Sequence, residues 1–287
     1  MTDIALTIAG SDSSGGAGIQ ADLNTFAALG VYGASVITAL TAQNTQGVSA
    51  IYDVPPGFIG AQIDAVFADL AIGAVKIGML FRPATVRAAA EGLARHRVRN
   101  VVLDPVTIAS SGDSLLAGNL VEAMRRRLIP HTLLVTPNLA EAAALTGATP
   151  ARTEREMEIQ AREILSLGAR HVLIKGGHGD GDECVDLLIG EGEVVRLSAK
   201  RIATKNTHGT GCTLSSAIAA GLAKGRDVVT ACQEAKAYVT AAIAHADELD
   251  IGHGPGPLNH FYKQAHDSEK WKAVFGKDHA QNKGSKP

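Results

Sequence analysis

Short apolar runs alternate with stretches of helical periodicity along most of the 287-residue chain, and this alternation limits the possible folds. The runs are rich in Val, Ile and Leu, which is typical of strands that are covered on both faces of a parallel sheet. They lie at Ile4–Ala9, Ala34–Ala39, Ala74–Ile77, Val101–Leu103, Leu133–Val135 and Val172–Ile174. Repeated strand-then-helix order predicts one α/β domain with a mostly parallel central sheet and helices on both faces.

The helices are expected between these runs, and several carry recognisable start and stop signals. Thr153 and Glu156 form a capping-box pair, and Pro83 suits the first position of a helix. Gly30 and Gly168 suit C-terminal caps. The expected helices are Ala17–Leu29, Gly57–Leu70, Pro83–Arg95, Leu115–Leu128 and Thr153–Leu167.

Two segments depart from this rhythm. Cys184–Ile189 and Val194–Leu197 flank a Gly190–Gly192 turn, which predicts an antiparallel hairpin at one edge of the sheet. From Lys263 onward the chain is polar and Lys-rich without periodicity. The sequence therefore predicts a folded domain over residues 1–262 and a polar, flexible tail over residues 263–287.

Composition excludes several classes of protein. The formal net charge of −2 gives no basic surface for nucleic acid or anionic membranes. No run approaches the roughly 18 apolar residues of a membrane-spanning helix. The first residues include Asp3 and lack the basic region of a secretory signal. Three cysteines at unrelated spacings form neither a disulfide framework nor a zinc pattern, so we expect a cytoplasmic protein.

A glycine-rich loop follows the first apolar run. Within it, Gly16, Gly18 and Ala21 have the spacing of a dinucleotide-binding fingerprint between a strand and a helix. The second strand ends without the Asp or Glu that would hold a ribose, and no Walker-type GxxxxGK[ST] motif occurs. A flexible turn and a dinucleotide-dependent oxidoreductase both remain possible interpretations of this loop.

A second glycine-rich loop, "THGTGCTL", leads into an amphipathic helix. Gly209 and Gly211 allow backbone N–H groups to face one point, where the helix N-terminus adds about half a positive charge. Such a site stabilises the charge of a phosphoryl group in transfer. Cys212 lies in the first turn, where a thiol pKa is typically lowered. The alternative is a buried structural cysteine.

Two carboxylates follow expected strands. Asp104 comes directly after one strand, and Asn138 and Glu141 come after the next. The spacing of Asn138 and Glu141 also fits a helix N-cap pair. Because open α/β sheets bind ligands at the carboxyl ends of their strands, Asp104 and Glu141 are expected to converge there. Two carboxylates at that edge suit Mg²⁺ that is bound mostly through water.

In combination, these motifs resemble the ribokinase-like superfamily of small-molecule kinases. Most sugar kinases of that superfamily have GTGD, with the aspartate as general base, where this chain has GTGC. The cysteine is similar to that of vitamin kinases acting on hydroxymethylpyrimidine and pyridoxal. The closer resemblance, from Ile4 to about Phe261, is to the bifunctional hydroxymethylpyrimidine/phosphomethylpyrimidine kinases of thiamine biosynthesis. It rests on segments such as "AGSDSSGGAGIQAD", "KIGML", "VVLDPV", "TPNLAEAAAL" and "KNTHGTGCTL".

This resemblance implies an activity and a set of roles. ATP would phosphorylate 4-amino-5-hydroxymethyl-2-methylpyrimidine and then its monophosphate, with Mg²⁺ held by Asp104 and Glu141. The substrate pocket would include Gly10, Asp22, Gln43, Met79 and Val106. The anion hole would be Gly209, Thr210, Gly211 and Cys212, with Cys212 accepting the alcohol proton. ATP and its phosphates would contact Asn138, Lys175, Thr207 and Lys236.

Several alternatives accompany this interpretation. Pyridoxal kinase shares the fold and the motif, but the corresponding lid, Thr107–Leu115, has serines and no cysteine, which favours the pyrimidine. A non-catalytic binding protein is less consistent, because Asp104, Glu141 and Cys212 are all present. Lys236 is equally well explained as a solvated helix residue, and His208 as a loop residue. The edge hairpin and the resemblance suggest a homodimer.

Overall fold

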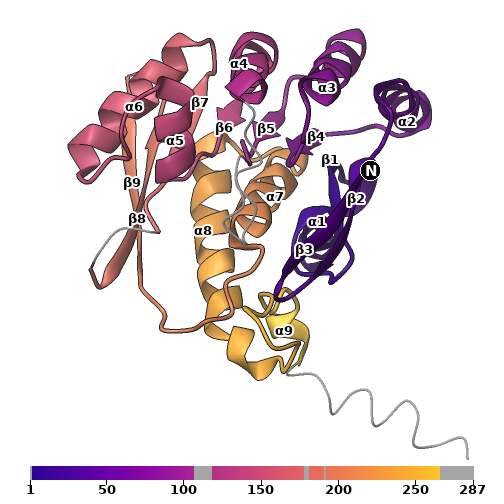
Figure 1. Ribbon diagram of the computed structural model, residues 1–287. Helices are drawn as coiled ribbons and strands as arrows, with labels where there is room; N and C mark the ends of the chain where they lie inside the picture. Colours follow the sequence, from indigo (N-terminus) through magenta and orange to yellow (C-terminus); the bar gives the residue numbers. More distant parts are fainter. Residues whose placement is uncertain (1, 107–117, 178–180, 191, 266–287) are drawn as a thin grey trace, which may run out of the picture.

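A computed structural model describes residues 2–106, 118–177, 181–190 and 192–265 (Figure 1). Its described residues form one nine-stranded sheet with the order β3-β2-β1-β4-β5-β6-β7-β8-β9. The pairs from β2 through β1 to β7 are parallel, whereas β3, β8 and β9 each pair antiparallel with a neighbour. The strands are β1 (Ile4–Asp12), β2 (Tyr32–Asn44), β3 (Gly47–Asp53), β4 (Ala74–Ile77), β5 (Val101–Leu103), β6 (Leu134–Val135), β7 (His171–Lys175), β8 (Glu183–Ile189) and β9 (Val194–Lys200).

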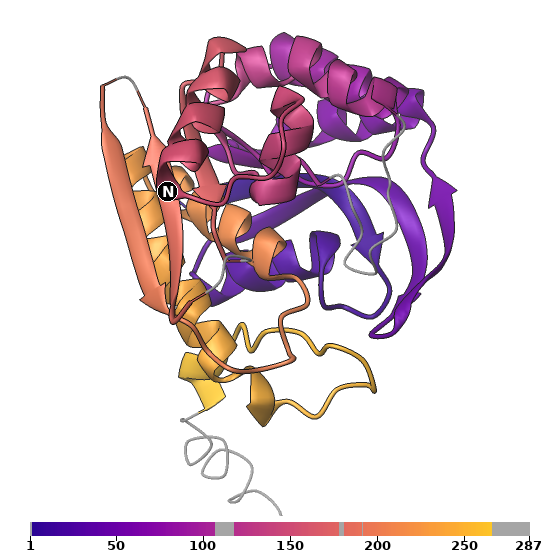
Figure 2. The same ribbon diagram turned by 60° about the vertical axis from the view of Figure 1, so that its left-hand side comes forward.

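Helices cover both faces of the sheet, as the sequence predicts. Helices α2 to α6 lie on one face of the sheet, and α1, α7 and α8 lie on the other (Figures 1 and 2). One core gathers apolar residues from the first group, and a second core gathers those from the second group. A further short helix closes the described chain. The helices are α1 (Gly18–Ala28), α2 (Pro56–Asp69), α3 (Pro83–Arg95), α4 (Gly118–Arg127), α5 (Leu139–Thr146), α6 (Glu154–Ser166), α7 (Thr210–Ala223), α8 (Val228–Ala244) and α9 (Tyr262–Ala265).

The central strands are apolar throughout because alternate residues enter different cores. In β5, Val101 and Leu103 belong to the core beneath α2 to α6, while Val102 belongs to the core beneath α7 and α8. All three side chains are fully buried. Each such side chain contributes about 1.5–3 kcal/mol relative to an exposed one. This double burial explains why a three-residue strand is recognisable in the sequence.

Local signals place several helix ends correctly. The predicted range of α3 matches the structure, and Thr153 caps α6 in a full capping box with Glu156. Gly30 and Gly168 have φ angles of 70° and 109°, as expected where a helix ends in a left-handed turn. The expected start of α4, three residues before Gly118, lies outside the described residues.

The sequence predicts the strands at one edge of the sheet but not the strand at the other edge. The predicted hairpin is present as β8 and β9, with β9 at one edge (Figure 2). At the other edge, β3 pairs antiparallel with β2, placing Tyr52 opposite Leu40, and the sequence analysis missed it. Its side chains alternate irregularly between half-buried and exposed, so "GVSAIYD" does not form an apolar run. An edge strand that buries little gives a weak periodic signal.

The chain order reverses around β1, which lies between β2 and β4. In open α/β sheets, ligands bind outside the carboxyl ends of the strands at such a reversal. The first glycine loop follows β1 there, and Met79 follows β4. No helix within the described part of the chain is long and apolar enough to cross a membrane.

Candidate active site

The last residues of β1 pack directly against the residues that follow β4. A Cβ atom on Gly10 would overlap the Cε atom of Met79, so only glycine leaves room for this side chain. Thr38 Oγ1 donates to the carbonyl of Met79 at 2.7 Å and fixes its backbone. Gly10 and Met79, two of the predicted substrate contacts, therefore lie together at the reversal point of the sheet.

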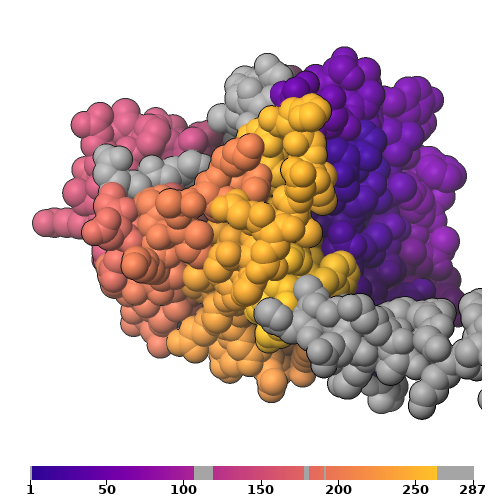
Figure 3. All heavy atoms as spheres, turned by 90° about the horizontal axis from the view of Figure 1, so that it is seen from below, coloured from indigo at the N-terminus to yellow at the C-terminus, as the bar shows by residue number. Residues whose placement is uncertain are grey.

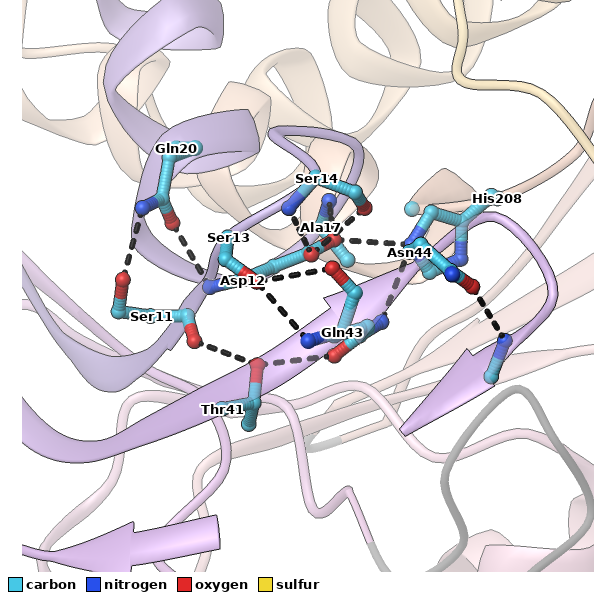
Figure 4. Close-up of polar contacts among 12 residues, drawn as sticks. Ser11, Asp12, Ser13, Ser14, Ala17, Gln20, Thr41, Gln43, Asn44 and His208 are labelled. Carbon is cyan, nitrogen blue, oxygen red and sulfur yellow. Dashed lines mark hydrogen bonds and ion pairs between the residues drawn. The ribbon is translucent and has the colours of Figure 1, made fainter. Parts of the chain in front are cut away.

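Polar groups from three segments meet at the end of β1 (Figure 4). The Asp12 carboxylate accepts hydrogen bonds from Ser14 N and Oγ at 2.8 and 2.7 Å, and from Ala17 N at 2.9 Å. His208 Nε2 lies 2.9 Å from Asp12 Oδ2 and 3.4 Å from Gln43 Nε2. Burial opposes ionisation of Asp12, but the hydrogen bonds from His208 and Ser14 lower its pKa.

The second glycine loop touches the first. Gly209 has a φ angle of 83°, and a Cβ atom there would overlap the carbonyl oxygen of Gly16. Glycine therefore meets both a left-handed backbone and a close approach. The loop is also tied internally, since Thr210 Oγ1 donates to the carbonyl of Thr207 at 2.7 Å. This geometry places the N-terminus of α7 beside the loop that follows β1.

Asp104, Glu141 and Lys175 meet at the start of α7. Lys175 Nζ lies 2.8 Å from Asp104 Oδ1 and 3.9 Å from Glu141 Oε2. A Cβ atom on Gly211 would lie 3.3 Å from that Nζ and 3.6 Å from Asp104 Oδ2. Burial opposes the charge on Lys175, but Asp104 and Glu141 raise its pKa to about 12. The predicted convergence of Asp104 and Glu141 is confirmed.

The capping interpretation of Asn138 and Glu141 also holds. Asn138 Oδ1 accepts from Glu141 N at 2.8 Å, and Glu141 Oε2 accepts from Asn138 N at 2.8 Å. One carboxylate thus caps α5 and faces Lys175. The two interpretations of this pair, as a helix cap and as part of the site, are compatible.

Asp22 lies beneath the site with no exposed surface. Its carboxylate accepts from Thr7 Oγ1 at 2.6 Å, from Ser216 Oγ at 2.7 Å and from Lys76 Nζ at 2.8 Å. A fully enclosed carboxylate offers no face to a ligand, so the observed role of Asp22 is to join α1, α7, β1 and β4.

Lys76 is a residue that the sequence analysis missed. Burial opposes its charge, but Asp22 raises its pKa, and both side chains are fully buried. The signal was a lysine inside the apolar strand "AVKI". Because a buried charge requires a partner, this lysine indicated an ion pair near the carboxyl ends of the strands.

The expectation of a lowered pKa for Cys212 is wrong. Burial raises the pKa of this thiol to about 11, and the nearby carboxylates of Asp22 and Asp104 act in the same direction. Lys76 opposes them without compensating. Desolvation and two negative charges therefore raise the pKa of the thiol, and it is neutral near pH 7.

Two other predicted residues border the site. Val106 is half-buried, and its N–H donates to the carbonyl of Asp104 at 2.8 Å. Lys236 is not a solvated helix residue, because its Nζ donates to Asp186 Oδ2 at 2.7 Å and its side chain is 15% exposed. Asp186 also accepts from Gly176 N at 3.0 Å, so this pair fixes the turn after β7.

The remaining sequence features are His208, clusters of metal-ligating side chains and the serine-containing lid. His208 is a loop residue, as predicted, but its ring is buried and bonded to Asp12. No cluster of three or more metal-ligating side chains occurs among the described residues. The serine-containing lid, Thr107–Leu115, lies outside them.

Comparisons with known proteins agree with this geometry. The family model described as phosphomethylpyrimidine kinase matches residues 12–259. A hydroxymethylpyrimidine/phosphomethylpyrimidine kinase from Rhizobium meliloti is 59% identical over 263 residues, covering 92% of this chain and 98% of the relative. These matches also set aside the dinucleotide-dependent oxidoreductase and the non-catalytic binding protein.

Solved structures give the same fold. The ADP complex of Bacillus subtilis pyridoxal kinase superimposes with a TM-score of 0.84 at 35% identity, covering 92% of this chain and all of that one. A phosphomethylpyrimidine kinase from Clostridium difficile has a TM-score of 0.75 at 45% identity, covering 84% and 99% of the two chains. The predicted ribokinase-like α/β fold is therefore confirmed, and the chain belongs to the phosphomethylpyrimidine kinase family.

Proposed function

We propose that this kinase transfers the γ-phosphoryl group of ATP to 4-amino-5-hydroxymethyl-2-methylpyrimidine, and that a second ATP phosphorylates the monophosphate to the diphosphate. The observation that carries the proposal is the Lys175–Asp104 ion pair at the start of α7, so close to Gly211 that a Cβ atom there would lie 3.3 Å from Lys175 Nζ. Donor N–H groups, a partly buried ammonium and a carboxylate meet there. Phosphoryl transfer depends mainly on such positioning and charge stabilisation.

The N-terminus of α7 is assigned to the transferred group. Backbone N–H groups of Gly209, Gly211 and Cys212, together with the helix dipole, stabilise the negative charge that develops on it, while the N–H of Thr210 donates to the carbonyl of Thr207 at 3.3 Å. Lys175 neutralises charge on the ATP phosphates, and its pKa of about 12 keeps it protonated at neutral pH. Asn138, Thr207 and Lys236 complete the ATP side of the site in this proposal.

Asp104 and Glu141 fit a magnesium ion. Both carboxylates already approach one positive charge, the ammonium of Lys175, at 2.8 and 3.9 Å. Mg²⁺ in kinases uses one or two carboxylates and completes its shell with water and phosphate oxygens, so two carboxylates suffice. When bound, the ion would neutralise phosphate charge during transfer. Lys175 shares that task from the protein side.

The pyrimidine is assigned to the pocket between the two glycine loops. Met79 and Val106 supply apolar contacts to the ring, Gly10 leaves room for the Met79 side chain, and Gln43 supplies an amide for hydrogen bonds. Asp22 supports the pocket floor from within the core. The thiolate form of Cys212, a small fraction at neutral pH, accepts the alcohol proton in the first step. The phosphate acceptor of the second step is already ionised near neutral pH.

One assay separates this proposal from pyridoxal kinase, to which the likeness of the Bacillus subtilis structure points. ADP release is measured with ATP and Mg²⁺, offering the pyrimidine alcohol, its monophosphate and pyridoxal in separate reactions. Turnover of both pyrimidines with weak turnover of pyridoxal is the expected result. Turnover of pyridoxal alone would assign the protein to that alternative.

A cytoplasmic homodimer is proposed for the assembled enzyme. Its three cysteines are free thiols, which suits a reducing compartment. Leu40 and Tyr52, paired across β2 and β3 at the sheet edge, are 45% and 69% exposed and favour burial against a second copy. Light scattering coupled to gel filtration tests this, and a monomeric mass at micromolar concentration would contradict it.

A further inference from the structure

The amide of Gln43 lies between two side chains whose hydrogen bonds limit its orientation (Figure 4). Thr41 Oγ1 is 3.1 Å from one end of the amide, Oε1, and His208 Nε2 is 3.4 Å from the other end, Nε2. Gln43 is also anchored through its backbone, since its N–H donates to Ser13 Oγ at 2.9 Å and its carbonyl accepts from that hydroxyl at 2.8 Å.

The partner of His208 fixes the location of one proton. Nε2 lies 2.9 Å from Asp12 Oδ2, and an ionised carboxylate only accepts hydrogen bonds. Nε2 therefore carries a hydrogen and has no lone pair with which to accept from the Gln43 amide nitrogen. Thr41 has a single hydroxyl hydrogen, which it donates to the carbonyl of Ser11 at 2.8 Å.

We propose that His208 is a positioning residue for the substrate pocket. Its N–H selects one of the two orientations of the Gln43 amide, the one in which the carbonyl oxygen faces the imidazole. A half-turn about the terminal bond exchanges the two ends of the amide. The carbonyl oxygen then faces the His208 Nε2–H, which donates mainly to Asp12 at 2.9 Å and reaches the amide as the longer, 3.4 Å branch of a bifurcated hydrogen bond. The NH₂ group donates to the free lone pair of Thr41 Oγ1. Each neighbour of the amide is matched in this orientation.

The selected orientation has a consequence for recognition, which rests on the proposed function. After bonding His208 and Thr41, the amide retains one N–H and one carbonyl lone pair. An aminopyrimidine presents a ring nitrogen that accepts beside an exocyclic amine that donates, so the two pairs are complementary. Pyridoxal has no amine beside its ring nitrogen. His208 thus favours the aminopyrimidine without contacting it.

His208 is held firmly enough for this role. Its side chain is 8% exposed, and its N–H donates to the carbonyl of Gly256 at 3.1 Å. A Cβ atom on Gly16 would overlap its ring, so the first glycine loop packs against it. The C-terminal part of the described chain, yellow in Figure 3, lies between the orange and indigo surfaces and includes Gly256. His208 also directly precedes Gly209, the first residue of the proposed anion hole.

The test is a double-mutant cycle between His208 and Gln43, read by calorimetric binding of the pyrimidine alcohol to the full-length enzyme. His208→Phe should weaken binding by about five- to tenfold, the effect of one hydrogen bond, and leave the KM for ATP within about twofold. In the Gln43→Ala background, His208→Phe should cause no further loss of binding. His208→Gln retains an N–H donor and should recover part of the affinity.

Controls separate positioning from folding. His253→Phe changes an exposed histidine three positions before Gly256 and should leave binding unchanged. If His208→Phe does not unfold cooperatively, the same cycle is run with Thr41→Val, which removes the other partner of the amide. An equal loss of binding with and without Gln43 overturns the proposal, as does a Gln43→Ala enzyme with unchanged affinity. Wild-type enzyme that neither binds nor phosphorylates the pyrimidine refutes the proposed function itself.

Discussion

The raised pKa of Cys212 leads to a specific prediction about the first phosphorylation step. With a pKa of about 11, few of the thiols are ionised at neutral pH. At pH 7, about four pH units below this value, roughly one molecule in ten thousand carries the thiolate. If the thiolate accepts the alcohol proton, kcat/KM for the pyrimidine alcohol should rise about tenfold per pH unit from pH 7 toward pH 10. The second step should be nearly independent of pH over this range.

Substitution of Cys212 gives the matching test. Cys212→Ala should lower kcat/KM for the alcohol by about 100-fold at pH 8, the lower end of general-base contributions, and should abolish its rise with pH. The monophosphate should lose less than about tenfold, because its phosphate oxygen needs no base. ADP release with each acceptor, measured from pH 6.5 to 10, supplies both profiles. Cys184→Ala, which removes a half-buried thiol on β8, is the control.

Two outcomes would refute this reasoning. Equal losses of both steps in Cys212→Ala would assign the residue to the anion hole or to packing. A wild-type profile for the alcohol that is flat above pH 7 would show that no thiolate participates. The profile of kcat/KM reports the free enzyme, so the comparison applies to the same state as the structure.

Three further predictions concern the supports of the site. Lys76→Met leaves the buried Asp22 carboxylate without its counter-charge and should lower the free energy of unfolding, measured by urea denaturation, by about 3–5 kcal/mol. Adding Asp22→Asn should recover part of this loss, and fully additive losses in the double variant would contradict the pairing. Gly209→Ala should lower kcat of both steps by about tenfold or more, because a Cβ atom has no room there. Gly225 has a φ angle of 79° but open space around it, so Gly225→Ala should leave kcat unchanged. Equal effects of the two substitutions would mean that backbone strain alone is responsible. Burial lowers the pKa of His260 to about 4, so the unfolded chain binds a proton between pH 6.5 and 4 that the folded chain does not. Stability present above pH 6.5 should therefore be lost as the pH falls, by about 3 kcal/mol in total, and His260→Gln should flatten this dependence; an unchanged slope would contradict the assignment.

The sequence predicts those elements of the fold that have a clear burial pattern or a local signal for a helix start. Val101–Leu103 and Ala74–Ile77 are strands buried on both faces, and their predicted limits match the structure. Thr153 and Pro83 mark helix starts through interactions within a few residues. The strand β3 could not be predicted in this way, because its pairing with β2 buries little and leaves its side chains without a regular pattern.

Within the site, the sequence predicts the convergence of those residues that directly follow the ends of parallel strands. Asp104 and Glu141 were expected to converge because parallel strands end at one edge of the sheet, and both approach Lys175. The pKa of Cys212 could not be predicted, because its sequence neighbours indicate a helix N-terminus while the opposing charges come from elements far away in the chain. Lys76 meets Asp22 across 54 positions, and no local pattern encodes that distance.

The ion pair between Lys76 and Asp22 also has a consequence for biosynthesis. The chain is made from its N-terminus, so α1, β1 and β4 leave the ribosome long before α7, which covers their common face and contributes Ser216 to the Asp22 carboxylate. Until residues beyond 210 emerge, both charges and the apolar surface around them remain hydrated. We therefore expect the nascent chain to complete the helices on the opposite face first and to close its reaction centre only near the end of translation.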